Sequence, residues 1–148
     1  MSGAAGITTR RLREQDLASG FLESLDALRP ASHMGQAAAS RVLDSVAANP
    51  NHVILVAERD GRVIGATTLL IEPKFIHDGG LVGHIEDVSV RDGERGAGAG
   101  SALVRAAIEE ARRAGCYKVV LECSERLVPF YERLGLSRHS VSMRRDLC

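Results

Sequence analysis

The sequence predicts a single α+β domain, residues 1–148, with a mixed and mostly antiparallel central sheet flanked by helices. Two observations carry this prediction. The chain has 148 residues, of which 45% are apolar, and this is enough to bury one real core. Its segments follow in the order β, α, α, β, β, β, α, β, α, β, without a repeat or a linker, which is typical of a mixed sheet with helices.

The amino-terminal third contains one expected strand and two expected helices. The strand lies near 7–11, and the residues after it carry apolar side chains at mostly helical spacing, which predicts a helix over 12–28 that Pro30 ends. These apolar residues are Leu12, Leu17, Phe21, Leu22, Leu25 and Leu28. Residues 35–48 predict a second, short helix that ends before Asn49-Pro50.

The middle of the chain predicts three strands. Residues 52–72 contain two β-rich runs around Asp60-Gly61, a dipeptide that favours the two-residue turn of a β-hairpin. A loop over 73–80 follows these two strands. Residues 81–90, with the sequence LVGHIEDVSV, then predict the next strand, which leads directly into a glycine-rich segment.

The carboxy-terminal part predicts helix, strand, helix and strand. An apolar stripe formed by Leu103, Val104, Ala107, Ile108 and Ala111 predicts a long amphipathic helix after the glycines, with Ser101 in its first turn and Gly115 as its C-cap. A strand over 117–123 and a helix over 124–135, capped by Ser124, come next. Residues 137–147 are expected to form the last strand.

The segment Arg95–Gly100, RGAGAG, has glycine at three alternate positions immediately before the long helix. Glycine destabilises helices and strands by roughly 0.5–1 kcal/mol relative to alanine, so this pattern indicates a backbone conformation or a close approach that a side chain would forbid. Unpaired N–H groups at a helix amino terminus favour an anion such as a phosphate. The segment is neither a P-loop, which needs Gly-Lys-Ser/Thr, nor a dinucleotide loop, because Ser101 and Leu103 replace the required glycine.

Bulk composition argues against several classes of partner. Lys plus Arg and Asp plus Glu are equal at 19 each, and aromatic residues are few, so no nucleic-acid partner is expected. The amino-terminal residues lack the apolar core of a signal peptide, and no apolar run approaches the roughly 18 residues of a membrane span. We therefore expect a cytoplasmic protein without a membrane partner. Three cysteines without CxxC spacing favour free thiols, with neither a disulfide framework nor a metal site.

RGAGAG matches the R/Q-x-x-G-x-G/A pyrophosphate loop of the GNAT acetyltransferase superfamily. The segments GHIEDVSV, GCYKVVLEC and VPFYERLGL resemble one family within it, the eukaryotic-type glucosamine-6-phosphate N-acetyltransferases, and the likeness is strongest from Ile71 to Gly135. The resemblance implies a single GNAT domain over 1–148. It also implies transfer of acetyl from acetyl-CoA to the amine of glucosamine 6-phosphate, on the route to UDP-N-acetylglucosamine, by a homodimer and without a covalent enzyme intermediate.

The resemblance also implies where acetyl-CoA binds. Its pyrophosphate is expected on the backbone N–H groups of Gly96, Ala97, Gly98, Ala99, Gly100 and Ser101, with Arg95 adding positive charge. The pantetheine is expected along Val88, Ser89 and Val90, where this strand splays from the strand that follows the long helix. Main-chain groups of the first strand can then polarise the thioester carbonyl.

Acetyl transfer to an amine needs a neutral amine, a stabilised oxyanion and help for the departing thiolate. The resemblance implies that Glu86 and Asp87 bind the sugar hydroxyls and the amine, and that Glu122 receives or orients the amine. Which of these carboxylates is the general base stays open. Tyr131 is expected to direct its hydroxyl at the CoA sulfur, where a phenol can hydrogen-bond to or protonate the thiolate.

The substrate phosphate needs cations. Lys118 lies four residues before Glu122, and strand alternation places both on one face, so Lys118 is a candidate. The resemblance implies that an arginine near the carboxy terminus reaches the partner subunit's phosphate site. Asp146 occupies that position, so Arg144 or Arg145 is the candidate here, unless the phosphate is held differently.

A second departure is Leu127, which replaces an asparagine that contacts pantetheine in the family. The two departures leave other functions open. One is a GNAT enzyme for another amine, such as a different amino sugar, a polyamine or a peptide amino terminus. The other is a module that binds acetyl-CoA without catalysis, although Tyr131, Glu86 and Glu122 argue against it because binding alone requires only the glycine loop and its strand.

Overall fold

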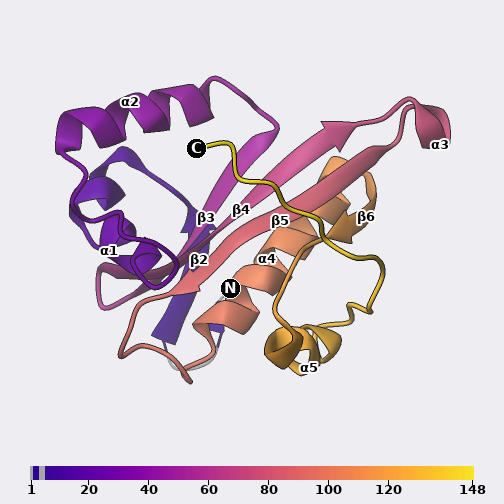
Figure 1. Cartoon of the computed structure of the whole chain (residues 1–148). Helices are drawn as coiled ribbons and strands as arrows, with labels where there is room; N and C mark the ends of the chain where they lie inside the picture. The colour runs from indigo at the N-terminus through magenta and orange to yellow at the C-terminus, as the bar shows by residue number, and fades with distance from the viewer. Residues whose placement is uncertain (1, 4–5) are drawn as a thin grey trace.

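The computed structural model describes residues 2–3 and 6–148, and within them it contains one six-stranded sheet whose strands lie side by side in chain order (Figure 1). The strands are β1 (Ser2–Gly3), β2 (Ile7–Arg11), β3 (His52–Arg59), β4 (Arg62–Pro73), β5 (Leu81–Val90) and β6 (Cys116–Val120). Neighbouring strands are antiparallel except β5 and β6, which are parallel and joined by helix α4 (Ala99–Ala114). The predicted mixed, mostly antiparallel α+β fold is confirmed.

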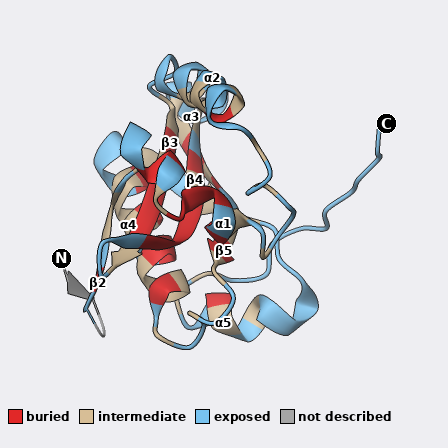
Figure 2. Ribbon diagram, turned by 90° about the vertical axis from the view of Figure 1, so that its left-hand side faces the viewer, coloured by how far each residue is buried: buried red, intermediate tan, exposed pale blue. Residues whose placement is uncertain are grey.

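Helices cover both faces of the sheet. Helix α4 buries Leu103, Val104, Ala107 and Ala111 against strand residues such as Ile85, and ends at Gly115, whose φ of +91° gives the predicted C-cap. Helices α1 (Phe21–Leu25) and α2 (Gln36–Ala47) cover the opposite face. The most buried residues lie on the central strands and on the inner sides of these helices (Figure 2). Within residues 2–3 and 6–148, no helix is both long and apolar enough to cross a membrane.

The predicted helix over 12–28 is wrong in its length. The chain instead forms a 3₁₀ helix, η2 (Glu14–Ala18), and then the short helix α1. The break occurs at Gly20, whose φ of +100° is left-handed and whose added Cβ would lie 2.6 Å from the carbonyl oxygen of Val63. Close packing against β4, to which the carbonyl of Ser19 is also hydrogen-bonded, therefore interrupts a pattern that is helical in sequence.

The predicted last strand over 137–147 is also wrong, because residues 137–148 have no regular secondary structure in this chain. A strand requires a neighbour for its backbone N–H and C=O groups, and no described strand lies beside this tail. Its apolar residues Val141, Met143 and Leu147 are all strongly exposed. Figures 1 and 2 together show the tail in front of the sheet and standing away from it.

The remaining predicted elements lie close to their expected places. The hairpin turn at Asp60-Gly61 and the strand 81–90 are confirmed. The loop after β4 contains a short helical turn, α3 (Ile76–Gly79). The strand predicted over 117–123 is shorter, since β6 ends at Val120. The helix after it begins as the 3₁₀ helix η3 (Glu125–Leu127) and continues as α5 (Val128–Glu132), and the side chain of Ser124 makes no capping hydrogen bond.

Candidate active site

The loop between β5 and α4, residues 91–98, has the conformation that its glycines suggest. Gly93, Gly96 and Gly98 have φ values of +87°, +86° and +93°. This left-handed region is readily available only to glycine, so another residue at these positions would strain the backbone. An added Cβ on Gly93 or Gly96 would meet no atom within 4 Å, so in this chain alone the glycines are required by conformation rather than by crowding.

This loop and the first turn of α4 present a row of unsatisfied donors. The first hydrogen bond of the helix runs from the N–H of Ala102 to the carbonyl of Gly98, at 3.0 Å. Across the described residues, the backbone N–H groups of 95–101 donate to no acceptor. Since α4 is 16 residues long, these donors stand at the positive end of a full helix dipole. The geometry therefore fits an anion such as the predicted pyrophosphate, with the exposed Arg95 beside it.

Strands β5 and β6 separate beside this loop. Their pairing joins residues 81–84 of β5 to 116–120 of β6 and goes no further. The backbone of β5 from Ile85 onward therefore has no partner on the β6 side within the described chain. Val88 and Val90 pack against the cluster under α4, so the backbone of this segment, rather than these side chains, is available to a ligand. This is the splay that was expected at the pantetheine site.

Ser89 directs its side chain to the other face. Its cross-strand neighbour is Ala66, which belongs to the cluster under α1. The hydroxyl is buried and has no hydrogen-bond partner among the described residues. Any role of Ser89 in binding acetyl-CoA therefore belongs to its main chain.

A β-bulge shapes the same strand on its β4 side. The register passes from Ala66 opposite Ser89 to Thr68 opposite Glu86, so two residues of β5 oppose one of β4. One of them, Asp87, has a φ of +51°, which is uncommon for any residue except glycine. The result is that Glu86 and Asp87 are both exposed, although they are adjacent in a strand.

The structure brings the three predicted carboxylates together. Although Glu86 is exposed, partial desolvation of its carboxyl raises its pKa, the negative charges of Asp87 and Glu122 raise it further, and His84 opposes them. Glu122 lies two residues beyond the end of β6, on the open side of the splay. A group of mutually repelling carboxylates favours a bound ammonium and holds one carboxyl with a stronger affinity for protons. The cluster can therefore bind an amine and accept its proton.

Tyr131 lies in α5 and is 8% exposed. Its ring meets that of Phe130 edge to face, with 4.9 Å between centroids. A Cβ added to Gly100 would lie 3.5 Å from Phe130 and 3.7 Å from Val90, so α5, the start of α4 and the end of β5 meet here. Burial raises the pKa of Tyr131, and the nearby Cys123 raises it further, so the phenol stays protonated and can act as a donor.

The predicted phosphate-binding residues are less well placed. Lys118 is exposed on β6, with its Nζ 5.7 Å from the centroid of the Tyr117 ring. Arg144 donates to Asp146 at 2.7 Å, and both residues are exposed. Across the described residues, neither Arg144 nor Arg145 makes a hydrogen bond or ion pair with the three predicted carboxylates. These assignments stay predictions.

Sequence reasoning missed two residues that shape the site. The hydroxyl of Thr67 is buried opposite the bulge and donates to the carbonyl of Glu86. His84 lies two residues before Glu86 on the same face of β5, and its Nε2 is 2.9 Å from Oε1 of Glu72. Neither has a local signal, because Thr67 lies in an ordinary β-rich run and Glu72 approaches His84 only through the pairing of β4 with β5.

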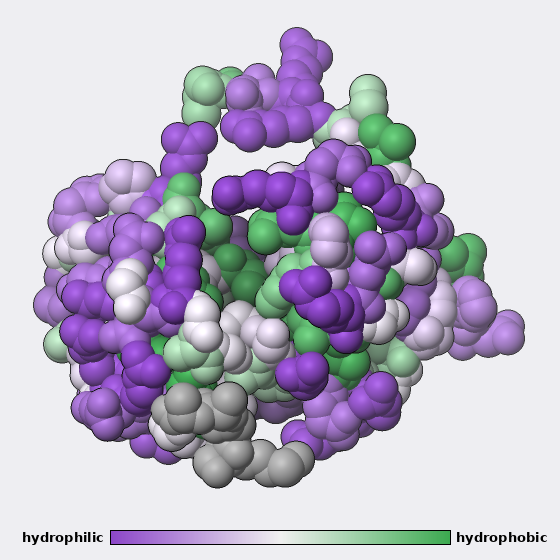
Figure 3. Space-filling view, turned by 90° about the horizontal axis from the view of Figure 1, so that it is seen from below, coloured by the Kyte–Doolittle hydropathy of each residue, from purple (hydrophilic) through white to green (hydrophobic). Residues whose placement is uncertain are grey.

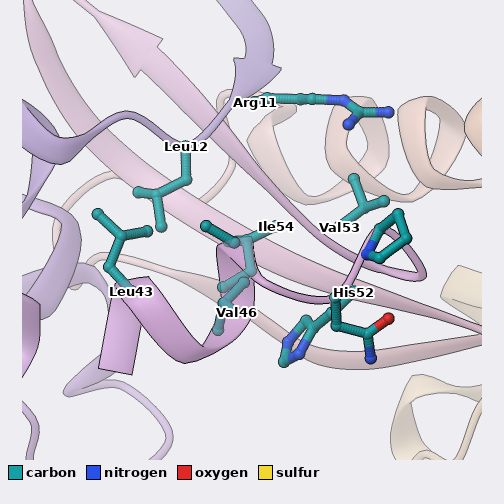
Figure 4. A pocket seen from close by; sticks show the side chains of 10 residues that line it. Arg11, Leu12, Leu43, Val46, His52, Val53 and Ile54 are labelled. Atoms are coloured by element: carbon teal, nitrogen blue, oxygen red, sulfur yellow. The ribbon is translucent and has the colours of Figure 1, made fainter. Parts of the chain in front are cut away.

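Two cavities lie between α2 and the sheet. One, of about 190 Å³, is partly open to solvent, is lined by residues in and next to α2, β2 and β3, and includes none of the predicted site residues (Figure 4). The other, of about 230 Å³, is mostly apolar and reaches Thr67, Thr68 and Asp87 at the bulge. Only the second therefore touches the candidate site. The face seen from below is hollowed, with hydrophobic surface inside the hollow and hydrophilic side chains around it (Figure 3).

A glycine loop with unpaired N–H groups at the start of a helix, beside a splayed pair of parallel strands, is the arrangement expected of enzymes that transfer an acyl group from a CoA thioester. The sequence model of the Acetyltransferase (GNAT) family matches residues 19–136. The chain belongs to this family.

Several named relatives share most of the chain. A glucosamine 6-phosphate N-acetyltransferase of Trypanosoma brucei brucei is 40% identical over 148 residues, which cover 99% of this chain and 100% of the relative. Glucosamine 6-phosphate N-acetyltransferase 1 of Oryza sativa subsp. japonica is 39% identical, covering 90% and 83%. The crystal structure of glucosamine-6-phosphate N-acetyltransferase from Arabidopsis thaliana superimposes with a TM-score of 0.92 at 32% identity, covering 96% of this chain and 99% of that one.

Proposed function

We propose that this protein transfers the acetyl group of acetyl-CoA to the amine of glucosamine 6-phosphate, giving N-acetylglucosamine 6-phosphate. The near full-length similarity to enzymes with this name supports the proposal. The observation in this chain that carries the proposal is the presence of two sites that favour ligands of opposite charge. Unpaired N–H groups at 95–101 suit the anionic end of acetyl-CoA, and the carboxylates around Glu86 suit a cationic amine.

The reaction proceeds by direct attack within a ternary complex. A carboxylate of the Glu86 cluster takes a proton from the sugar ammonium, and the freed nitrogen lone pair attacks the thioester carbon. Backbone donors of the β5 segment beside the splay stabilise the oxyanion. The carbon–sulfur bond then breaks, Tyr131 gives its proton to the departing thiolate, and the second proton of the nitrogen, lost as the amide forms, returns the phenol to its protonated state. The products are the amide, CoA thiol and one released proton.

We assign the acceptor phosphate to the β6 side of the carboxylates, with the exposed Lys118 as a cation from the same chain. Because Arg144 and Arg145 extend on the exposed tail, they serve the site of a second copy. Two features support a homodimer: residues 137–148 have no strand partner among the residues that the structure describes, and the tip of the β4–β5 hairpin exposes Phe75 and Ile76. Such exposed apolar side chains favour a protein–protein contact.

The acceptor is tested by CoA-thiol release from acetyl-CoA with glucosamine 6-phosphate, glucosamine and a panel of polyamines and peptides. Release with the phosphorylated sugar at far higher kcat/KM than with glucosamine supports the proposal. Equal rates with both sugars would mean that the phosphate is not recognised. Faster release with another amine would mean that this amine, rather than glucosamine 6-phosphate, is the acceptor. Light scattering on the full chain and on a chain ending at Leu136 tests the dimer, which the shorter chain should lose.

A further inference from the structure

One acidic side chain ties the loop 91–98 to the β3–β4 hairpin. Oε1 of Glu94 lies 2.8 Å from Nη2 of Arg62, and Oε2 is paired with Arg59. The side chain of Glu94 is only 14% exposed, although it lies in a surface loop between glycines. The link joins parts of the chain that are 32 and 35 residues apart.

The two arginines explain why a carboxylate is needed there. Arg59 and Arg62 are directly opposite each other in the antiparallel ladder of β3 and β4. Like charges at such positions repel each other. A carboxylate that accepts from both guanidinium groups removes the repulsion and is itself held from two sides, with charge-assisted hydrogen bonds.

Backbone hydrogen bonds hold the loop in place as far as the candidate anion site. The N–H of Arg91 donates to the carbonyl of Ile64 at 2.7 Å, and the N–H of Glu94 donates to the carbonyl of Arg91 at 3.0 Å. Beyond Glu94, the next backbone N–H that donates within the described residues is that of Ala102. Glu94 is therefore the last anchored residue before the seven unpaired N–H groups of 95–101.

We infer that Glu94 is a positioning residue for acetyl-CoA: its carboxylate, held between Arg59 and Arg62, fixes the loop so that the N–H groups of 95–101 point at one anion. This inference rests on the proposal that these groups bind the pyrophosphate. Preorganised donors bind more tightly because less conformational entropy is lost on binding. Glu94 does not touch the ligand and acts through the loop backbone.

A purely electrostatic role for Glu94 would have the opposite sign. A carboxylate near an anion site repels the anion, so neutralising it would strengthen binding if charge were its only effect. A positioning role instead predicts weaker binding after the same substitution. The sign of the change therefore separates the two roles.

The experiment measures the Kd of CoA by calorimetry, without an amine, for the wild type and for Glu94→Gln. We expect the Kd to rise about tenfold, and the KM of acetyl-CoA to rise with it, while kcat changes by less than about twofold. Glu109→Gln is the matched control, because Glu109 also pairs with two arginines, Arg112 and Arg113, but near the other end of α4. It should leave the Kd unchanged.

A double substitution tests the route of the effect. Arg59→Met with Arg62→Met should raise the Kd of CoA similarly, and adding Glu94→Gln should cause little further change, because all three residues form one link. Thermal unfolding of each variant confirms that it is folded. The inference about Glu94 would be overturned by an unchanged or lower Kd for folded Glu94→Gln. It would also be overturned if the effects of Glu94→Gln and of the double arginine substitution were additive. Neither result would contradict the proposed CoA site. Failure of the wild type to bind CoA would overturn the proposed CoA site itself.

Discussion

The hydroxyl of Thr67 donates a hydrogen bond of 3.0 Å to the backbone carbonyl of Glu86. This contact lies at the β-bulge, where the backbone of Asp87 has left-handed geometry and both Glu86 and Asp87 are exposed. The bond gives the carbonyl of Glu86 a donor at a point where a bulge locally disrupts the ladder, and it supports the strand where the amine is expected to bind. Thr67 therefore connects the packing of the sheet to the placement of the carboxylates.

Replacing Thr67 with valine tests this connection. Thr67→Val keeps the shape of the side chain but removes the donor, so the free energy of unfolding should fall by about 1 kcal/mol. The bulge should also loosen, and kcat/KM should fall several-fold. Thr9→Val is the control, since Thr9 makes no side-chain hydrogen bond among the described residues. If Thr67→Val loses stability but keeps full activity, the bond has no role in placing Glu86.

The pH dependence of kcat/KM tests Glu86 as the general base. Its pKa is raised by partial desolvation of the carboxyl and by the charges of Asp87 and Glu122. Glu122→Gln removes one of these charges and so lowers the pKa of Glu86, which moves the acidic limb of the profile to lower pH. Glu125→Gln, at an exposed residue paired with Arg138, should leave the limb in place. A limb that does not move in Glu122→Gln would assign the proton transfer to another group.

Removing the hydroxyl of Tyr131 tests its role as a donor to the thiolate. Tyr131→Phe should lower kcat by about 100-fold, because a general acid contributes at least this much, and should leave the Kd of CoA almost unchanged. Tyr117→Phe is the matched control, since Tyr117 is the chain's other tyrosine and stacks on His77 at 3.9 Å. A small loss of kcat in Tyr131→Phe would mean that the thiolate leaves without this phenol.

The buried carboxylate of Asp16 links stability to pH. Burial alone would raise its pKa, but hydrogen bonds from Arg10 and from the backbone of Arg13 lower it below the ordinary value of 3.8. Its stabilising contribution is therefore present above the ordinary pKa and is lost as the pH falls through the native pKa. Asp16→Asn should lower the free energy of unfolding by about 3 kcal/mol at neutral pH, because it leaves Arg10 with one partner fewer.

Chemical denaturation over a pH series checks this prediction. The difference between the wild type and Asp16→Asn should begin to narrow below about pH 4, where the carboxyl becomes protonated in the unfolded state, and its charge-dependent part should be lost once the pH falls through the lower native pKa. Asp44→Asn, at an exposed position on α2, should have no such effect. A difference that stays constant at acidic pH would mean that the shape of the side chain, rather than its charge, carries the stability.

The sequence predicted well the elements whose signals are local. The turn at Asp60-Gly61 and the apolar stripe of α4 depend on neighbouring residues, and both are where they were expected. The break at Gly20 was not predictable, because its cause is the approach of Val63 from a distant strand. The tail at 137–148 has the length of a strand but pairs with no strand in the described part of the chain, and pairing cannot be predicted from one segment alone.

The candidate site divides in the same way. The glycine loop was predictable, because the left-handed geometry of Gly96 and Gly98 is what the glycines signal. The roles of Tyr131 and Glu122 came from resemblance, and the structure supplies the physical setting: a buried phenol and a carboxylate beside Glu86. The bulge at Asp87 has no signature in the sequence, because an aspartate in a β-rich run predicts nothing about the sign of φ.

The unpaired N–H groups of residues 95–101 also determine how this part of the chain exchanges hydrogen with solvent. Amides of a helix interior are protected by their hydrogen bonds, whereas these amides belong to a well-packed helix and its loop yet have no acceptor among the residues that the structure describes. They should therefore exchange within the fastest phase, beside slowly exchanging residues such as Leu103 and Val104. A bound diphosphate would supply the missing acceptors, so the slowing of these amides alone would map the ligand onto the backbone residue by residue.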